Sequence, residues 1–182
     1  DESWTFTIEK APVKHYGNDI SVNYYGKDLH LFPFLGDTDW KGNLSVLKNA
    51  GYAGFVLTNH FIKGNTSVPR DLDWNTRMQM YYDSYLEAKD EGDKLDFDVF
   101  FGIEHAYGKG KEILIYGIDL DFLQSHPELE YADIKTYSEL VHEVGGILVH
   151  AHPHRKRDYI KEGVLPRYDV CDGIEVYNAW IA

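Results

Sequence analysis

Five short apolar segments of this chain each end in, or lead directly into, a histidine or a carboxylate. Their valine, isoleucine, leucine and phenylalanine content is typical of buried β-strands. Burying a charged group or an imidazole costs free energy unless the group is paired, so we expect these polar ends to meet at one site. Histidine, glutamate and aspartate are ligands for zinc, manganese and iron. The segments are KDLHLF (27–32), GFVLTNH (54–60), VFFGIEH (99–105), GILVHAHP (146–153) and GIEVYN (173–178).

Length, charge and cysteine content exclude several classes of protein. The 182 residues are enough for one domain with a sizeable core. The formal net charge of −12 argues against an extended nucleic-acid surface, which would need a basic face. Cys171 is the only cysteine, so no disulfide or cysteine-based zinc site is expected within the chain. No apolar run approaches the roughly 20 residues of a membrane span. The chain begins at Asp1, which we interpret as a processed or trimmed terminus, and its location stays open between cytoplasmic and secreted.

Helical patterns alternate with the apolar segments. The three expected helices cover residues 39–50, 71–91 and 133–144. Their expected N-caps are Asp39, Asp71 or Asp73, and Asp133, and their expected stops are Gly51, Gly92 and Gly145–Gly146. A further apolar run, EILIYGID, covers 112–119. Strands alternating with helices predict βα units and a largely parallel sheet, whose C-terminal strand ends would carry the site.

Together and in this order, the motifs resemble the PHP (polymerase and histidinol phosphatase) superfamily of metal-dependent phosphoesterases. The resemblance covers about residues 26–178, and rests on KDLHLF with Asp37 after it, GYAGFVLTNH, FFGIE, GGILVHAHP and DGIEVYN. It implies an α/β fold, a distorted (β/α)7 barrel over residues 26–182. Residues 1–25, which are aromatic and polar, are interpreted as an N-terminal embellishment. It also implies two or three divalent ions (zinc, manganese or iron) and a metal-bound hydroxide that cleaves phosphate esters. The expected partner is a small phosphorylated substrate or a short oligonucleotide.

The resemblance carries roles to individual residues. The implied metal ligands are His30, Asp37, His60, Glu104 and His152. Glu104, as the bridging carboxylate, and His152 are also the implied catalytic residues. The basic cluster HPHRKR (152–157) places His154 and Arg155 where phosphate would bind, since an arginine fork suits phosphate oxygens. Asn178, at the end of the last strand, is a further substrate-binding candidate.

The chain departs from the family pattern at three places. Phe32 stands where the family has a second histidine ligand, and a phenyl ring cannot bind metal. Glu112 stands where many members have a histidine, so it either binds metal or is solvated. The closing Asp-x-His motif of the family does not occur before Ala182, which favours a truncated barrel.

Several candidates also have ordinary structural explanations. Asp37 could belong to a turn or a helix cap, and Asn178 to a helix cap. Arg155 could equally lie in a solvated loop. His150 shares strand parity with His152, so it is either a support for the site or a core histidine. His105 should point away from Glu104 and is interpreted as structural.

Three functions remain open from the sequence. The first is a metal-dependent phosphoesterase. The second is a degenerate PHP domain that binds metal or a partner without turnover, which Phe32 and the missing Asp-x-His motivate. The third is another metal-dependent hydrolase, for instance one that cleaves a C–N bond. A serine hydrolase or a P-loop nucleotide-binding protein fits less well, because the chain has no Gly-x-Ser-x-Gly and its GKG (108–110) lacks the P-loop ending.

Overall fold

The structure is a computed structural model. It describes residues 20–24, 27–31, 33–35, 40–49, 51–64, 66, 68–153, 155–156, 158–160 and 164–176, with side chains from residue 44 onward. The strands are β1 (Ile20–Tyr24), β2 (Lys27–Leu31), β3 (Pro33–Leu35), β4 (Gly54–His60), β5 (Asp98–Gly108), β6 (Lys111–Tyr116), β7 (Ile147–His150) and β8 (Gly173–Ile174). The helices are α1 (Trp40–Asn49), α2 (Trp74–Lys94), α3 (Leu120–Ser125) and α4 (Ile134–Glu143), with a 3₁₀ turn over Pro127–Glu130.

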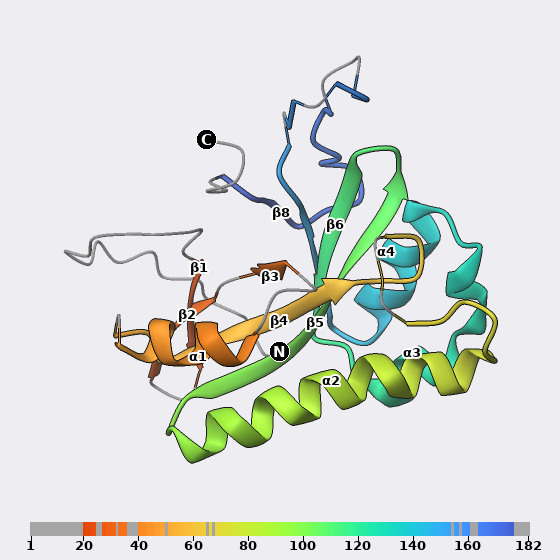
Figure 1. Ribbon diagram of the computed structural model, residues 1–182. Helices are drawn as coiled ribbons and strands as arrows, with labels where there is room; N and C mark the ends of the chain where they lie inside the picture. Colours follow the sequence, from red (N-terminus) through yellow and green to blue (C-terminus); the bar gives the residue numbers. More distant parts are fainter. Residues whose placement is uncertain are drawn as a thin grey trace.

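The main sheet is open and mixed, so the predicted (β/α)7 barrel is wrong. Within the described residues its order is β3-β4-β5-β6-β7-β8, and its first and last strands form edges (Figure 1). The pairs β3–β4, β4–β5 and β7–β8 are parallel, whereas β6 is antiparallel to both of its neighbours. The C-terminal ends of β4, β5, β7 and β8 and the N-terminal end of β6 therefore lie along the same side of the sheet, which is called the site edge because it runs across the strands.

The strand that carries His30 does not belong to this sheet. β2 pairs with β1 in a separate two-stranded antiparallel sheet, in which Ser21 is the register partner of His30. The expectation of one sheet that joins the strand of His30 to those of His60 and Glu104 is therefore wrong. The direction of the His30 side chain lies outside the described part of the structure.

A tight hairpin explains why β6 runs against its neighbours. β5 ends at Gly108 and β6 begins at Lys111, leaving only Lys109 and Gly110 between them. Gly110 has a φ of +69°, a left-handed conformation that residues with a Cβ rarely adopt. A two-residue connection with glycine is typical of β-hairpins, and the pair projects beyond the rest of the sheet (Figure 1).

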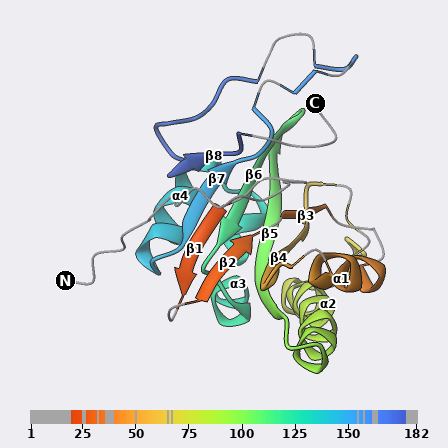
Figure 2. The same cartoon turned by 90° about the vertical axis from the view of Figure 1, so that its left-hand side faces the viewer.

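The α-helices of the described residues, α1 to α4, all cover one face of the sheet. α1 and α2 pack against alternate residues of β4 and β5 that include Leu57 and Val99. α2, α3 and α4 continue this core over Ile103, Ile113 and Leu148, and Figure 2 shows α1 beside α2. The residues that face the other way include Thr58, His60 and Glu104, which alternate with the helix-facing set. The candidate site therefore lies on the face away from the helices.

Aspartate caps begin α2 and α4 as predicted. Asp73 accepts a hydrogen bond from the backbone of Thr76 at 3.1 Å, and Asp133 accepts one from Thr136 at 2.9 Å. Predicted α1 is also confirmed, although its expected cap, Asp39, lies outside the described residues. None of the helices in the described ranges is long and apolar enough to cross a membrane.

Gly92 does not end α2, contrary to the prediction. The helix continues to Lys94, and Leu95 is its C-cap. Gly92 is buried because the chain turns back over it into β5: a Cβ on Gly92 would lie 2.5 Å from the Phe97 carbonyl oxygen and 2.6 Å from Val99 Cγ2. Glycine is thus needed here for close packing rather than for a helix stop.

We expect Gly92→Ala to destabilise the protein although alanine is the better helix former. The propensity gain is about 1 kcal/mol, whereas overpacking against a backbone carbonyl costs about 1–3 kcal/mol or more. The measurement is denaturant unfolding, with Glu87→Ala at an exposed position of the same helix as the control. A Gly92→Ala protein more stable than the wild type would show that β5 does not pack this closely on α2.

Candidate metal centre

Glu104 is the centre of the candidate site. It lies within β5, four residues before the strand ends, and its side chain is fully buried. Its Oε1 accepts a hydrogen bond from His152 Nε2 at 3.2 Å. Its Oε2 has no hydrogen-bond partner among the described residues. A buried carboxylate oxygen without a donor is costly, which makes it a candidate for cation binding.

His60 stands directly beside Glu104. It is the last residue of β4, and the parallel register pairs it with Glu104. Its Nδ1 lies 3.5 Å from Glu104 Oε2. The convergence predicted for these two strand residues is confirmed, because adjacent parallel strands place paired residues on the same face.

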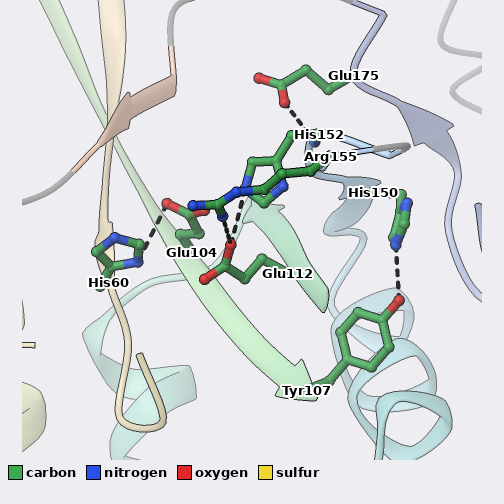
Figure 3. A network of polar contacts seen from close by, with 8 residues as sticks. All are labelled: His60, Glu104, Tyr107, Glu112, His150, His152, Arg155 and Glu175. Atoms are coloured by element: carbon green, nitrogen blue, oxygen red, sulfur yellow. Dashed lines mark hydrogen bonds and ion pairs between the residues drawn. The ribbon is translucent and has the colours of Figure 1, made fainter. Parts of the chain in front are cut away.

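His152 approaches Glu104 from the opposite side to His60 (Figure 3). Its Nε2 lies 3.2 Å from Glu104 Oε1 and 3.0 Å from Glu112 Oε2. β7 ends at His150, and His152 has a φ of +30°, outside strand geometry. Regular alternation would turn His152 toward the helices with His150. The left-handed backbone conformation of His152 instead directs its side chain toward the candidate site.

Two carboxylates determine the protonation of His152. Burial lowers its pKa, but hydrogen bonds to Glu104 and Glu112 and the charges of these groups outweigh burial and raise the pKa to about 9. Burial raises the pKa of Glu112, yet the hydrogen bond from His152 and the positive charges around it hold the pKa below the usual range. Without a metal, His152 is therefore an imidazolium at neutral pH that contacts both Glu104 and Glu112.

Glu112 belongs to the site, which the sequence left undecided. As the second residue of antiparallel β6, it starts where β4 and β5 finish. Its Oε2 accepts hydrogen bonds from His152 and from Arg155 Nη1, the latter at 2.9 Å. A backbone hydrogen bond from Arg155 N to His152 O, 3.1 Å long, closes the turn that returns Arg155 to Glu112.

The donor set fits a divalent cation. Ligating atoms of His60, Glu104 and Glu112 all lie within 4.8 Å of one another. Ligands at about 2.0–2.2 Å from a tetrahedral zinc ion stand about 3.4 Å apart, and the His60–Glu104 separation is 3.5 Å. One imidazole and two carboxylates suit zinc, manganese or iron. The Glu104 oxygen that lacks a donor would gain a partner.

Other predicted site residues are not placed in the centre. Arg155 contacts the centre through Glu112, not as an open phosphate fork. Asp37, His154 and Asn178 lie outside the described residues, as do the side chain of His30 and all of Phe32.

His105 and His150 both face the helices. His150 Nε2 is hydrogen-bonded to the Tyr107 hydroxyl at 2.8 Å, away from the carboxylates (Figure 3). The expectation that His150 shares the direction of His152 is therefore wrong, because His152 has left the strand geometry. His105 stacks on Tyr137 with ring centroids 4.0 Å apart, as expected for a structural residue.

Glu175 was missed by the sequence analysis. It is buried directly after β8, and its Oε2 accepts a hydrogen bond from the backbone N–H of His152 at 2.6 Å. The signal that could have found it is the carboxylate inside the apolar segment GIEVYN, which was passed over for Asn178.

Compared with known proteins, the chain matches none of the family models scanned and none of the curated proteins searched. The resemblance to the PHP superfamily therefore stays a prediction. What can be argued about function comes from the side chains of the candidate metal centre.

Proposed function

We propose that this protein is a metal-dependent hydrolase that cleaves phosphate esters at the centre formed by His60, Glu104 and Glu112. The observation that carries the proposal is that ligating atoms of these three residues lie within 4.8 Å of one another, around a fully buried carboxylate. A cluster of this kind is costly to bury unless a cation compensates the carboxylates.

The chain's own residues would divide the work. His60, Glu104 and Glu112 would hold a zinc, manganese or iron ion, which would activate water as a nucleophile and polarise a phosphoryl oxygen. His152 would either bind the ion through Nε2 or hold a proton on that atom, since one nitrogen cannot do both. Arg155 would bind a non-bridging phosphate oxygen, because its guanidinium lies next to Glu112 at the edge of the centre.

The substrate would be a small phosphorylated molecule or a short oligonucleotide. The net charge of −12 leaves no basis for a long polyanion, and Arg155 is one local cation beside the metal ligands. One observation favours the alternative function, binding without turnover: Nη1 of Arg155 already donates to Glu112, which leaves fewer of its N–H groups for a phosphate.

The test is a substrate screen on the protein loaded separately with zinc, manganese and iron(II). The substrates are a phosphomonoester, a phosphodiester and an amide with chromogenic leaving groups. We expect metal-dependent release from a phosphate ester and none after chelation. Metal binding without any turnover would favour the binding protein, and amide cleavage alone would favour a C–N hydrolase.

We expect Arg155→Ala to separate phosphate binding from metal binding. Losing a charge-assisted hydrogen bond of about 1.5–3 kcal/mol should raise the KM for the phosphate ester at least about tenfold. Metal affinity should not fall, because the substitution removes a cation that competes for Glu112 Oε2. Isothermal titration with zinc and steady-state kinetics give the two values.

The matched control is Arg167→Ala. Arg167 is also an arginine paired with a carboxylate, Asp169 at 2.7 Å, but on an exposed segment. It should change neither KM nor zinc affinity. An Arg155→Ala protein with unchanged KM, or one that no longer binds zinc, would contradict the phosphate role.

A further inference from the structure

Glu175 is a buried carboxylate that the proposed hydrolysis does not use. Its side chain is 7% exposed, and it comes directly after β8 at the edge of the sheet that carries the centre. Burial raises the pKa of Tyr116, and the charges of Glu175 and Glu104 raise it further. In Figure 3, Glu175 points toward the backbone of His152 and not toward Glu112.

The hydrogen bonds of Glu175 join β8 to the last residues of β7 and the turn after it. Its backbone N–H donates to the His150 carbonyl at 2.9 Å, which continues the parallel ladder. Its carboxylate then accepts the N–H of His152 at 2.6 Å. The Glu175 side chain therefore replaces a backbone acceptor at the point where the chain leaves β7.

This contact coincides with an unfavourable backbone conformation. His152 has a φ of +30°, which is uncommon for any residue other than glycine, although histidine adopts positive φ more often than most, and such a conformation persists where the surrounding structure holds it. The same conformation brings His152 Nε2 to 3.2 Å from Glu104 and 3.0 Å from Glu112. An extended His152 would instead follow the alternation of β7 and face the helices.

We propose that Glu175 is the positioning residue of the metal centre: by binding the His152 N–H, it holds the imidazole turned toward Glu104 and Glu112. It touches neither metal nor substrate and acts through His152. The inference rests on the metal-binding part of the proposed function and not on the reaction. Side chains that orient ligands typically contribute 10- to 100-fold to metal affinity.

The chain contains a matched control for this contact. Asp172, at the other end of the same strand pair, accepts the backbone N–H of Leu148 at 2.8 Å, and its own N–H donates to the Leu148 carbonyl. Leu148 faces the helix-side core. Asp172 therefore makes the same kind of bond between the same two strands without supporting a side chain of the metal centre.

The experiment titrates cobalt(II) into the wild type, Glu175→Ala, Glu175→Gln and Asp172→Ala. We expect Glu175→Ala to weaken cobalt binding about 10- to 100-fold, because the inference takes His152 as a ligand that binds the ion through Nε2. The cobalt affinity of Glu175→Gln should fall less than about fivefold, because the glutamine amide oxygen still accepts the His152 N–H. Asp172→Ala should bind cobalt within about twofold of the wild type although its unfolding midpoint falls.

Three results would overturn the inference. Glu175→Ala could bind cobalt like the wild type, or Asp172→Ala could weaken binding as much as Glu175→Ala. The cobalt affinity of Glu175→Gln could fall as much as that of Glu175→Ala, which would assign the effect to the charge of Glu175 and not to its hydrogen bond.

A metal-free measurement separates this inference from the proposed function. In chelator-treated protein, NMR should show a hydrogen-bonded His152 Nε2 proton in the wild type, Glu175→Gln and Asp172→Ala, but not in Glu175→Ala. If the wild type bound no cobalt, the proposed function would fail while this comparison still decided the role of Glu175. A His152 Nε2 proton signal retained in Glu175→Ala would refute that role.

Discussion

Glu104→Gln is expected to abolish metal binding and turnover together. Glutamine has the same size but lacks the negative charge, and Glu104 is the fully buried carboxylate that lies between His60 and His152. Because even groups that only orient ligands contribute 10- to 100-fold, we expect zinc affinity to fall by more than about 100-fold. Isothermal titration with zinc and phosphate ester hydrolysis measure the two losses on the same samples.

Glu128→Gln is the matched control for this loss. Glu128 also contacts a histidine, His126 Nδ1 at 2.8 Å, but its side chain is 52% exposed and outside the centre. Its substitution should leave zinc affinity and turnover unchanged. A Glu104→Gln protein that hydrolysed phosphate esters at the wild-type rate with normal zinc content would contradict the proposed site.

His105→Phe is expected to reduce the loss of stability on acidification. His105 is fully buried, stacks on Tyr137, and neither of its ring nitrogens has a hydrogen-bond partner among the described residues. Burial, and secondarily the charge of Lys63, lower its pKa to about 3. Its ordinary pKa in the unfolded chain is about 6.5. Between these values the unfolded chain binds a proton that the folded protein does not.

The free energy of unfolding of the wild type should therefore decrease as pH falls below about 6.5, and decrease further until about pH 3. Phenylalanine keeps an aromatic ring on Tyr137 and cannot take up a proton. Between pH 7 and pH 4.5 the free energy of unfolding of the wild type should fall by about 2.5 kcal/mol more than that of His105→Phe. Urea unfolding in the presence of chelator at both pH values measures the difference. Equal losses in the two proteins would mean that His105 is protonated in the folded state.

Much of the local structure was accessible from the sequence. The strand expected over residues 54–60 matches β4, and Asp73 and Asp133 cap the helices as their positions predicted. Short apolar segments and aspartate caps are local signals, so they can be predicted without knowing how the strands pair. The pairing of His60 with Glu104 follows from two adjacent parallel strands and was also predictable.

The barrel was wrong because one connection was misinterpreted. The segment GKG (108–110) lies between two apolar runs, where glycine signals a hairpin, and the structure has a hairpin there. The hairpin reverses β6, and a reversed strand excludes the all-parallel sheet of a (β/α)7 barrel. It also brings the start of β6, and with it Glu112, to the edge where β4 and β5 carry His60 and Glu104.

The remaining features of the centre depend on conformations that residue types do not encode. The direction of the His152 side chain results from the left-handed backbone conformation of this one residue after β7. The presence of a histidine in the sequence does not predict that conformation. The Arg155–Glu112 ion pair joins residues 43 positions apart. The Glu175 contact requires β8 to pair with β7 in one register. Each is a tertiary outcome rather than a local pattern.

The central claim is that His60, Glu104 and Glu112 bind one divalent cation. Anomalous diffraction from crystals soaked in zinc chloride tests it most directly, because zinc is located independently of the protein model. We expect a peak about 2.0–2.2 Å from one atom of each of the three side chains. Zinc bound elsewhere, or no zinc peak beside Glu104 at saturating concentration, would contradict the account.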